Sequence, residues 1–218
     1  SGATAAIDTP DAEEILRQAA AKGWAITDVW NTHWHPDHAG GNAAIKAATG
    51  ARVSGPAEVE RIGTAPDRIL AEGDVVKLGA HEARVLDVGG HTLGHIAYVF
   101  DAEKIAFVGD ALFALGCGRL FEGTPQQMWA SLQKLAALPD DSTLYCAHEY
   151  TLSNARFAAS VDGANAALKV RISEIERLRA AGAPTVPMRL SEEKATNPFL
   201  RAPLLKPELA DWEAFAEI

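Results

Sequence analysis

The chain has 218 residues, of which 48% are hydrophobic and 22% are charged, and its formal net charge is −9. That length is enough to bury a full core, either as one large domain or as one domain with a smaller appendage. The acidic balance argues against a nucleic-acid surface, and no apolar run approaches the roughly 20 residues needed to span a bilayer.

The distribution of charge and the cysteine count further restrict the kind of protein that this sequence can encode. Residues 165–218 hold eight Lys or Arg and eight Asp or Glu, so the whole negative excess lies in residues 1–164, where bound cations would offset part of it. Cys117 and Cys146 are too few for a disulfide framework, and we expect free thiols in a reducing compartment, hence a cytoplasmic protein. The sequence begins without Met and ends within a helical pattern, so we expect both ends to be cut, and a targeting segment stays open.

Residues 1–150 alternate between strand and helix patterns. Residues 4–8 read as a strand, and Thr9-Pro10 then offers an N-cap and a first-turn proline for a helix that runs to Lys22 and stops at Gly23. A buried strand over 25–30 and a helix over 42–48 follow. Further elements are expected as strands at 52–54, 74–78, 83–88, 96–100, 104–108 and 144–146, and as a helix at 124–138.

From Tyr150 onward the strand patterns stop. Residues 164–181 carry apolar side chains at helical spacing and end at Gly182, and prolines break the remainder into short pieces. The sequence therefore predicts an α/β domain over residues 1–150 and a small helical domain over residues 151–218.

A cluster of metal-binding side chains follows the strand at 25–30, in the order Thr32-His33-Trp34-His35-Pro36-Asp37-His38. Residues two apart in an extended segment project from the same side, so His33 and His35 can converge on one point. Pro36 turns the chain, and Asp37 and His38 then leave toward a second metal centre. Imidazole nitrogen with carboxylate oxygen suits zinc and tolerates iron or manganese. The plainer alternative is a polar turn with satisfied histidines, but such an ordered spacing favours metal.

Three further ligand-type residues, His91, Asp110 and His148, each stand at the exit of an apolar strand. Strand exits along one edge of a sandwich can converge on the first cluster, and this pattern is the argument for ligation. Of the other histidines, His81 lies in a polar turn and is expected at the surface. We expect His95 to orient a ligand rather than to bind metal, because metal-bound imidazoles need outer partners.

In this order, these residues resemble the metallo-β-lactamase superfamily, whose motif is shared by β-lactamases, lactonases, nucleases and persulfide dioxygenases. More narrowly, several segments resemble the hydroxyacylglutathione hydrolase (glyoxalase II) family: residues 109–113, 116–123, 145–151, 184–187 and 197–201. The resemblance implies an α/β fold, an αββα sandwich, followed by a small helical carboxy-terminal domain that binds substrate.

The resemblance also implies two divalent metal ions per chain, with zinc favoured and iron or manganese accepted. One ion would be held by His33, His35 and His91, the other by Asp37, His38 and His148, and Asp110 would bridge both. Asp37 and Asp110 would be the catalytic residues, because a water activated by the two cations attacks a thioester carbonyl while Asp37 orients it or accepts its proton.

The implied substrate is a small-molecule glutathione thioester, S-(2-hydroxyacyl)glutathione such as S-D-lactoylglutathione. Cleavage to glutathione and a 2-hydroxy acid is the second step of methylglyoxal detoxification. Arg119 and Tyr150 match family residues that contact glutathione, whereas Phe121 stands where the family usually has Tyr, so that a hydroxyl contact with the substrate is absent. The family's carboxy-terminal Arg-x-x-Lys pair is not reached by Ile218, which we attribute to truncation.

Other functions remain alternatives at this point. A persulfide dioxygenase would need a single iron, a lactonase would not need the segment Cys117–Glu122, and a non-catalytic metal-binding module would be expected to lose ligands first. A cysteine nucleophile is disfavoured because the local sequence of Cys117 holds no histidine to activate it. We expect a monomer without nucleic-acid or membrane partners.

Overall fold

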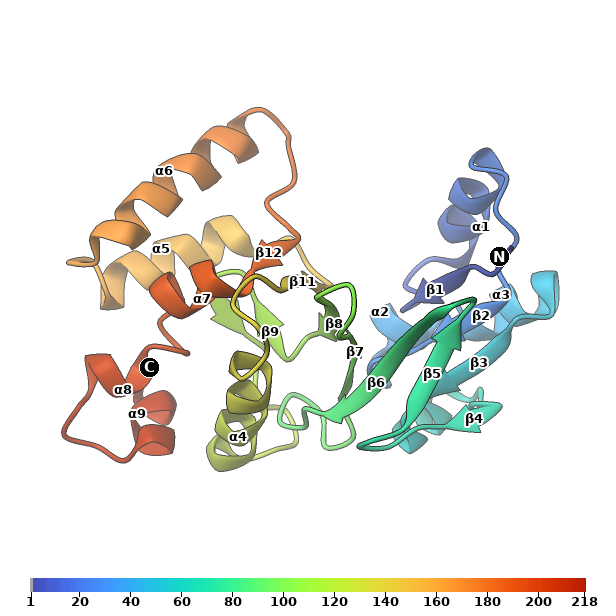
Figure 1. Cartoon of the computed structure of the whole chain (residues 1–218), viewed down its shortest axis with the longest axis horizontal. Coiled ribbons are helices and arrows are strands. Elements are labelled where there is room, and N and C mark those ends of the chain that lie inside the picture. Colours follow the sequence, from blue (N-terminus) through green and yellow to red (C-terminus); the bar gives the residue numbers. More distant parts are fainter. Residues whose placement is uncertain (1) are drawn as a thin grey trace. The chain divides into compact units, whose positions relative to one another are not determined.

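The computed structural model describes residues 2–218, and the chain divides into two compact units. The first unit contains the residues up to Asp87 together with Gly94–Glu103. The second contains Val88–Leu93 and everything from Lys104 onward. Figure 1 follows the chain through both units in sequence colours.

The first unit opens with a parallel sheet in the order β1-β2-β3-β4. Its strands are β1 (Ala5–Ile7), β2 (Asp28–Trp30), β3 (Arg52–Gly55) and β4 (Arg68–Ile69). Between them lie α1 (Ala12–Ala21), α2 (Pro36–Ala39), α3 (Asn42–Thr49) and the 3₁₀ helix η1 (Ala57–Ile62). The apolar faces of α1 and α3 meet the sheet around Val29, Ile45 and Val53, which are fully buried.

Helix α1 begins later than the sequence indicated. Its N-cap is Asp11, whose carboxylate accepts a hydrogen bond from the Glu14 N–H at 3.0 Å. Thr9, the expected cap, is fully buried, and its hydroxyl donates to Asn42 Oδ1 at 2.7 Å. A long-range hydrogen bond therefore occupies the group that the sequence assigned to the cap.

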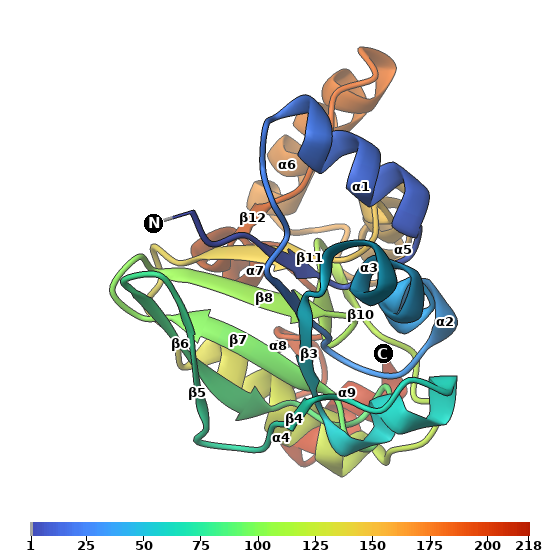
Figure 2. The same ribbon diagram turned by 90° about the vertical axis from the view of Figure 1, so that its right-hand side faces the viewer.

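An antiparallel meander completes the first unit (Figure 2). It consists of β5 (Val75–Leu78), β6 (His81–Asp87) and β7 (Ile96–Phe100). His81 begins β6 instead of lying in a turn, with its side chain exposed. Tyr98 on β7 stacks against Trp30 at 5.4 Å between ring centroids, and its hydroxyl donates to the Asn31 carbonyl at 2.7 Å.

The second unit is built on β8 (Ile105–Gly109) and β11 (Thr143–Cys146), which pair in parallel. The carboxyl ends of parallel strands lie at the same edge, so Asp110 and His148 emerge side by side. The other elements before residue 150 are the hairpin strands β9 (Leu112–Phe113) and β10 (Gly116–Cys117) and the helix α4 (Pro125–Ala136). Helix α4 has the expected Thr124 cap and first-turn proline.

Helices dominate the remainder of the second unit. They are α5 (Thr151–Val161), α6 (Ala166–Ala180), α7 (Leu190–Thr196), α8 (Ala202–Leu205) and α9 (Asp211–Glu217). In Figure 1 the red helix α9 lies beside α4, and the ring of Phe215 on α9 packs against that of Trp129 on α4 with 6.2 Å between centroids. None of the helices in residues 2–218 combines the length and the apolar character needed to cross a membrane.

The expectation that strands end before Tyr150 is wrong at one place. Met188 and Arg189 form β12, which pairs antiparallel with Thr143 and Leu144 of β11. Met188 is buried there. A strand of two residues carries no alternating pattern, so the sequence gives no local signal for it.

Candidate metal centre

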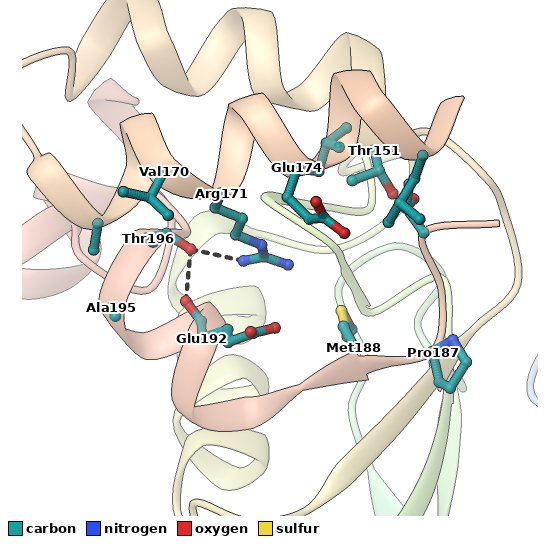
Figure 3. A pocket seen from close by; sticks show the side chains of 13 residues that line it. Thr151, Val170, Arg171, Glu174, Pro187, Met188, Glu192, Ala195 and Thr196 are labelled. Carbon is teal, nitrogen blue, oxygen red and sulfur yellow. Dashed lines mark hydrogen bonds between the residues drawn. The ribbon is translucent and has the colours of Figure 1, made fainter. Parts of the chain in front are cut away.

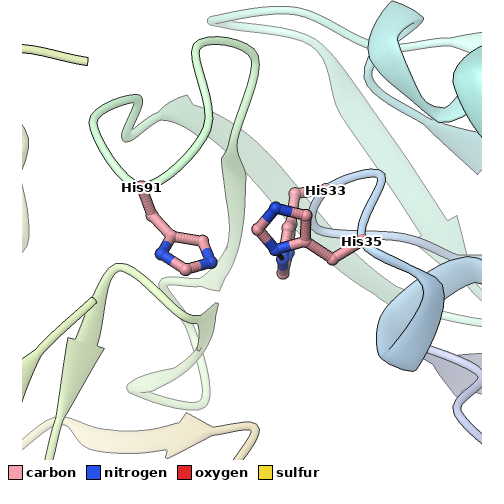
Figure 4. A group of neighbouring side chains, drawn as sticks. All are labelled: His33, His35 and His91. Carbon is pink, nitrogen blue, oxygen red and sulfur yellow. Dashed lines mark hydrogen bonds between the residues drawn. The ribbon is translucent and has the colours of Figure 1, made fainter. Parts of the chain in front are cut away.

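The first cluster of histidines lies at the carboxyl edge of the parallel sheet in the first unit. β1 and β2 are in register at Ile7 and Trp30, so Asp8 and the residues after Trp30 leave the sheet together. His33 is fully buried, and its Nε2 lies 3.0 Å from Nδ1 of His35. Figure 4 shows both rings on their shared loop, and His91 on a loop of its own.

Pro36 occupies the first turn of α2, where its missing N–H costs no hydrogen bond. In this helical turn, Asp37 and His38 point in a new direction. One carboxylate oxygen of Asp37 lies 3.8 Å from His38 Nε2. His38 is buried, whereas the Asp37 side chain is 58% exposed. All four candidate ligands of this segment belong to the first unit.

Asp8 holds this loop and was not among the residues singled out from the sequence. One carboxylate oxygen accepts from the Thr32 N–H at 2.8 Å, and the other accepts from the Thr32 hydroxyl at 2.9 Å. The second oxygen also lies 2.8 Å from His38 Nδ1. Asp8 has a φ of +58°, a left-handed conformation that Asp tolerates better than most residues, and this directs its side chain at the loop.

Two buried asparagine side chains also hold the loop that carries His33 and His38. The Asn31 amide donates to the His38 carbonyl at 2.9 Å, and the Asn42 amide donates to Asn31 Oδ1 at 2.7 Å. His95, 0% exposed, stacks on the His33 ring at a centroid distance of 4.6 Å. Such contacts fix the orientation of an imidazole before any metal arrives.

The second unit places Asp110 between two imidazoles. Its Oδ2 lies 3.5 Å from His91 Nε2 and 3.4 Å from His148 Nε2. These separations exceed an ordinary hydrogen bond and are close to the about 3.3 Å that separates two ligands of one tetrahedral zinc with bonds of about 2.0 Å. One carboxylate oxygen of Asp110 therefore faces two imidazoles.

Backbone contacts orient His91. Its Nδ1 lies 2.8 Å from the Arg119 carbonyl oxygen and so carries the proton, which leaves Nε2 available to bind a cation. Gly118 makes this approach possible, because a Cβ there would lie 2.0 Å from the Asp110 carbonyl oxygen and 2.9 Å from His91 Nδ1.

The candidate substrate residues flank the ligands of the second unit. Phe121 is 63% exposed, and its ring lies edge-on to His91 at 5.3 Å. Tyr150 is 48% exposed and stacks on His148 at 4.8 Å. The exposed Arg119 follows Gly118 directly. A ligand resting on these rings would lie beside His91 and His148.

Both cysteines are free thiols without the properties of a nucleophile. Desolvation raises the pKa of Cys117 to about 12 and, as the largest of several contributions, that of Cys146 to about 11. Because the thiolate is the reactive form, these groups are almost fully protonated at neutral pH.

The donor set fits divalent cations. His33 contacts the Thr32 hydroxyl through Nδ1 at 3.0 Å, and His38 contacts Asp8 through the same atom, as His91 does with Arg119. In all three, Nδ1 contacts an outer partner, and a metal would be bound through Nε2. Imidazoles and carboxylates in this ratio are typical ligands of zinc and related ions.

Two family models together cover almost the whole chain. The model of the metallo-β-lactamase superfamily matches residues 3–148, and that of the hydroxyacylglutathione hydrolase C-terminus matches residues 149–218. Among solved structures, the chain is similar to ETHE1 from Myxococcus xanthus at 25% identity (TM-score 0.71, covering 100% of this chain and 80% of that one). It is also similar in fold to the BLEG-1 B3 metallo-β-lactamase at 19% identity (TM-score 0.69, covering 91% and 89%). The chain belongs to the metallo-β-lactamase superfamily, and the predicted αββα fold class with a helical carboxy-terminal region is confirmed.

Relatives with higher sequence identity identify the family within this superfamily. The chain is 59% identical to a hydroxyacylglutathione hydrolase of Erythrobacter litoralis, over 93% of this chain and 80% of the relative. It is 56% identical to one of Hyphomonas neptunium (96% and 82%) and 53% identical to one of Maricaulis maris (100% and 88%). Within the superfamily, the chain belongs to the hydroxyacylglutathione hydrolases, which confirms the resemblance found in the sequence.

Proposed function

We propose that this chain hydrolyses S-(2-hydroxyacyl)glutathione thioesters, such as S-D-lactoylglutathione, to glutathione and a 2-hydroxy acid. The reaction is the second step of methylglyoxal detoxification. Family membership supports this function over a lactonase, a persulfide dioxygenase or a non-catalytic metal-binding module. The observation that carries the proposal is the Asp110 carboxylate, which faces His91 and His148 with one oxygen.

The proposed centre holds two divalent ions, with zinc favoured and iron or manganese accepted. One ion is assigned to His33, His35 and His91, the other to Asp37, His38 and His148, and Asp110 is shared. When bound, the two cations would polarise the thioester carbonyl and lower the pKa of a water nucleophile.

The chain's own residues position the reactants. The Asp37 carboxylate, which is exposed, orients the attacking water and accepts its proton. The water oxygen forms the new C–O bond, the C–S bond breaks, and Asp37 passes the proton that it accepted from the water to the departing glutathione sulfur. Asp110, whose carboxylate lies beside both His91 and His148, would be shared between the two cations.

The substrate is proposed to lie along the exposed face formed by Arg119, Phe121 and Tyr150. The Arg119 guanidinium is suited to a carboxylate of glutathione, because its fork binds carboxylates with two parallel hydrogen bonds. The Tyr150 phenol offers a further hydrogen bond, whereas Phe121 offers only an apolar surface. We assign residues 1–150 to catalysis and 151–218 to substrate binding, in a cytoplasmic monomer without nucleic-acid partners.

The test is hydrolysis of S-D-lactoylglutathione by the wild-type chain and by Asp110→Asn. The amide has the same size as the carboxylate but no charge to share between two cations. We expect kcat to fall about a hundredfold or more. The matched control is Asp141→Asn, which removes an exposed carboxylate paired with Lys104 in the same unit and should leave kcat unchanged. Equal rates for Asp110→Asn and the wild type would refute the proposal.

A further inference from the structure

The hairpin of β9 and β10 has an unusual turn. Its two turn residues are Ala114 and Leu115, and Leu115 has a φ of +59°. A positive φ at the second turn position is normally supplied by glycine, because a side chain there is strained. Leu115 is nevertheless fully buried, among Ala155 and Leu168 of the helical region. Something outside the hairpin must hold this turn in place.

Glu193 of α7 provides that support. Its side chain is 0% exposed, and its Oε2 accepts from the Leu115 N–H at 2.9 Å. The same oxygen accepts from the Asn197 amide at 3.0 Å. A buried carboxylate is costly unless every lone pair has a donor, so this placement is sustained only by its partners.

Two asparagines hold the remaining peptide groups of the hairpin. The Asn197 amide donates to the carbonyls of Phe113 at 3.1 Å and Gly116 at 3.0 Å, one on each strand. The Asn154 amide donates to the Ala114 carbonyl at 3.0 Å. The turn is therefore fixed by side chains from α5 and the end of α7, far away in the sequence.

Arg171 neutralises the buried carboxylate. One guanidinium nitrogen bonds Glu193 Oε1, and the other donates to the Thr196 hydroxyl at 2.6 Å. Figure 3 shows Arg171 reaching from α6 to Thr196 at the wall of a pocket. The Arg171 side chain is 12% exposed, so both charges lie largely out of water.

The hairpin connects the side chains that hold its turn to the candidate metal centre. Asp110 comes two residues before β9, and Gly118 and Arg119 come directly after β10. Gly118 lies against the Asp110 carbonyl with no space for a Cβ, and the Arg119 carbonyl accepts a hydrogen bond from His91 Nδ1. A shift of the turn would therefore move both the shared carboxylate and the group that orients His91.

We propose that Glu193 is a positioning residue of the hydrolase site, which acts by fixing the β9–β10 turn and through it the peptide groups around Asp110 and Arg119. The inference rests on the proposed function for its activity readout. It has a second readout, the affinity of the chain for zinc, which does not depend on the identity of the substrate.

The central test is Glu193→Gln. Glutamine has the same shape, but its amide nitrogen must face either the Leu115 N–H or the Arg171 guanidinium, and both are donors. We expect kcat for S-D-lactoylglutathione to fall about 10-fold to 100-fold. We also expect a lower affinity for zinc, measured in competition with a chromophoric chelator. Circular dichroism at the assay temperature establishes that the variant is folded.

Two further variants separate positioning from the loss of an ion pair. Glu174→Gln removes a carboxylate that also pairs with an arginine, Arg177, but on the exposed face of α6, and it should leave kcat and zinc affinity unchanged. Adding Arg171→Met to Glu193→Gln removes the opposing donor, so that the glutamine oxygen can again face the Leu115 N–H. We expect this double variant to regain most of the lost kcat and zinc affinity.

Two results would overturn the role of Glu193, and a third would overturn the proposed function alone. A folded Glu193→Gln variant with wild-type kcat and zinc affinity would overturn the positioning role. If that variant fails to fold, Asn154→Ala tests the same turn, and a folded Asn154→Ala chain with both quantities unchanged would overturn it as well. A wild-type chain that binds zinc but does not hydrolyse the thioester would refute the proposed function, and zinc affinity would still report on Glu193.

Discussion

At the scale of single residues, the ligand side chains are held by partners from other parts of the sequence. His38 and Thr32 are both held by Asp8, which lies 24 residues before Thr32. His91 is held by the Arg119 carbonyl, 28 residues away. The site is therefore oriented before metal binds, and part of the cost of ordering the ligands is met by folding.

The role of Asp8 leads to a prediction. Asn tolerates a positive φ as well as Asp does, so Asp8→Asn keeps the backbone and changes only the acceptors. The amide nitrogen must then face a donor, either the Thr32 N–H or His38 Nδ1. We expect zinc affinity to fall about 10-fold to 100-fold, measured by competition with a chelator.

The control for Asp8 is Asp28→Asn, which alters a carboxylate of the same unit that pairs with Arg52. Its zinc affinity should equal that of the wild type. If Asp8→Asn binds zinc as tightly as the wild type, Asp8 does not orient the loop.

The sequence was enough to single out the seven candidate ligands, because three ligand-type residues at strand exits accompany the ordered cluster at residues 33–38. It was not enough for Asp8 or Glu193. Asp8 is a single acid at the end of a strand, and Glu193 belongs to a charged run that resembles a solvated helix face. Their roles depend on burial and on distant partners, which residue type and spacing do not encode.

At the scale of secondary structure elements, carboxylates also join helices to strands. Asp67, just before β4, accepts from the Val53 N–H at 2.9 Å and pairs with Lys46 of α3. The hydrogen bond from Lys46, followed by that from Val53, lowers the pKa of Asp67 below its ordinary value. The ionised carboxylate therefore stabilises this corner of the first unit.

The pH dependence of this contact follows from the direction of the shift. A lowered pKa in the folded state means that the stabilisation is present above the unfolded pKa of about 3.9 and is lost as the pH falls through the folded pKa. We expect Asp67→Asn to reduce the free energy of unfolding by less than about 1 kcal/mol at pH 6, because the pair is partly exposed. Urea unfolding should show this difference shrinking toward pH 3, and a pH-independent difference would contradict the assignment.

Most of the long elements were predicted from the sequence, but helix α5 was not, and neither were the shortest strands. Helices α3, α4 and α6 were expected from caps and apolar spacing, and they form close to the expected bounds. The strands β9, β10 and β12 have two residues each, too few for a periodic pattern. The hairpin turn at Leu115 lacks the glycine that normally marks such a turn, so only tertiary contacts specify it.

At the scale of the whole molecule, the fold class and the family were accessible from the sequence because the motifs occur in a fixed order along the chain. The division into compact units could not be predicted from the sequence. Residues 88–93, which carry His91, belong to the second unit although they lie in the sequence between two segments of the first unit. The proposed ligands are thus divided between the units: His33, His35, Asp37 and His38 in the first, and His91, Asp110 and His148 in the second.

The number of metal ions per chain tests this account most directly. The chain is freed of metal with a chelator, reloaded with zinc, passed through a desalting column and analysed by elemental mass spectrometry. We predict two zinc ions per wild-type chain, loss of hydrolysis in the metal-free chain and its return on reloading. One ion per chain, or full hydrolysis by the metal-free chain, would contradict a centre in which seven residues hold two cations.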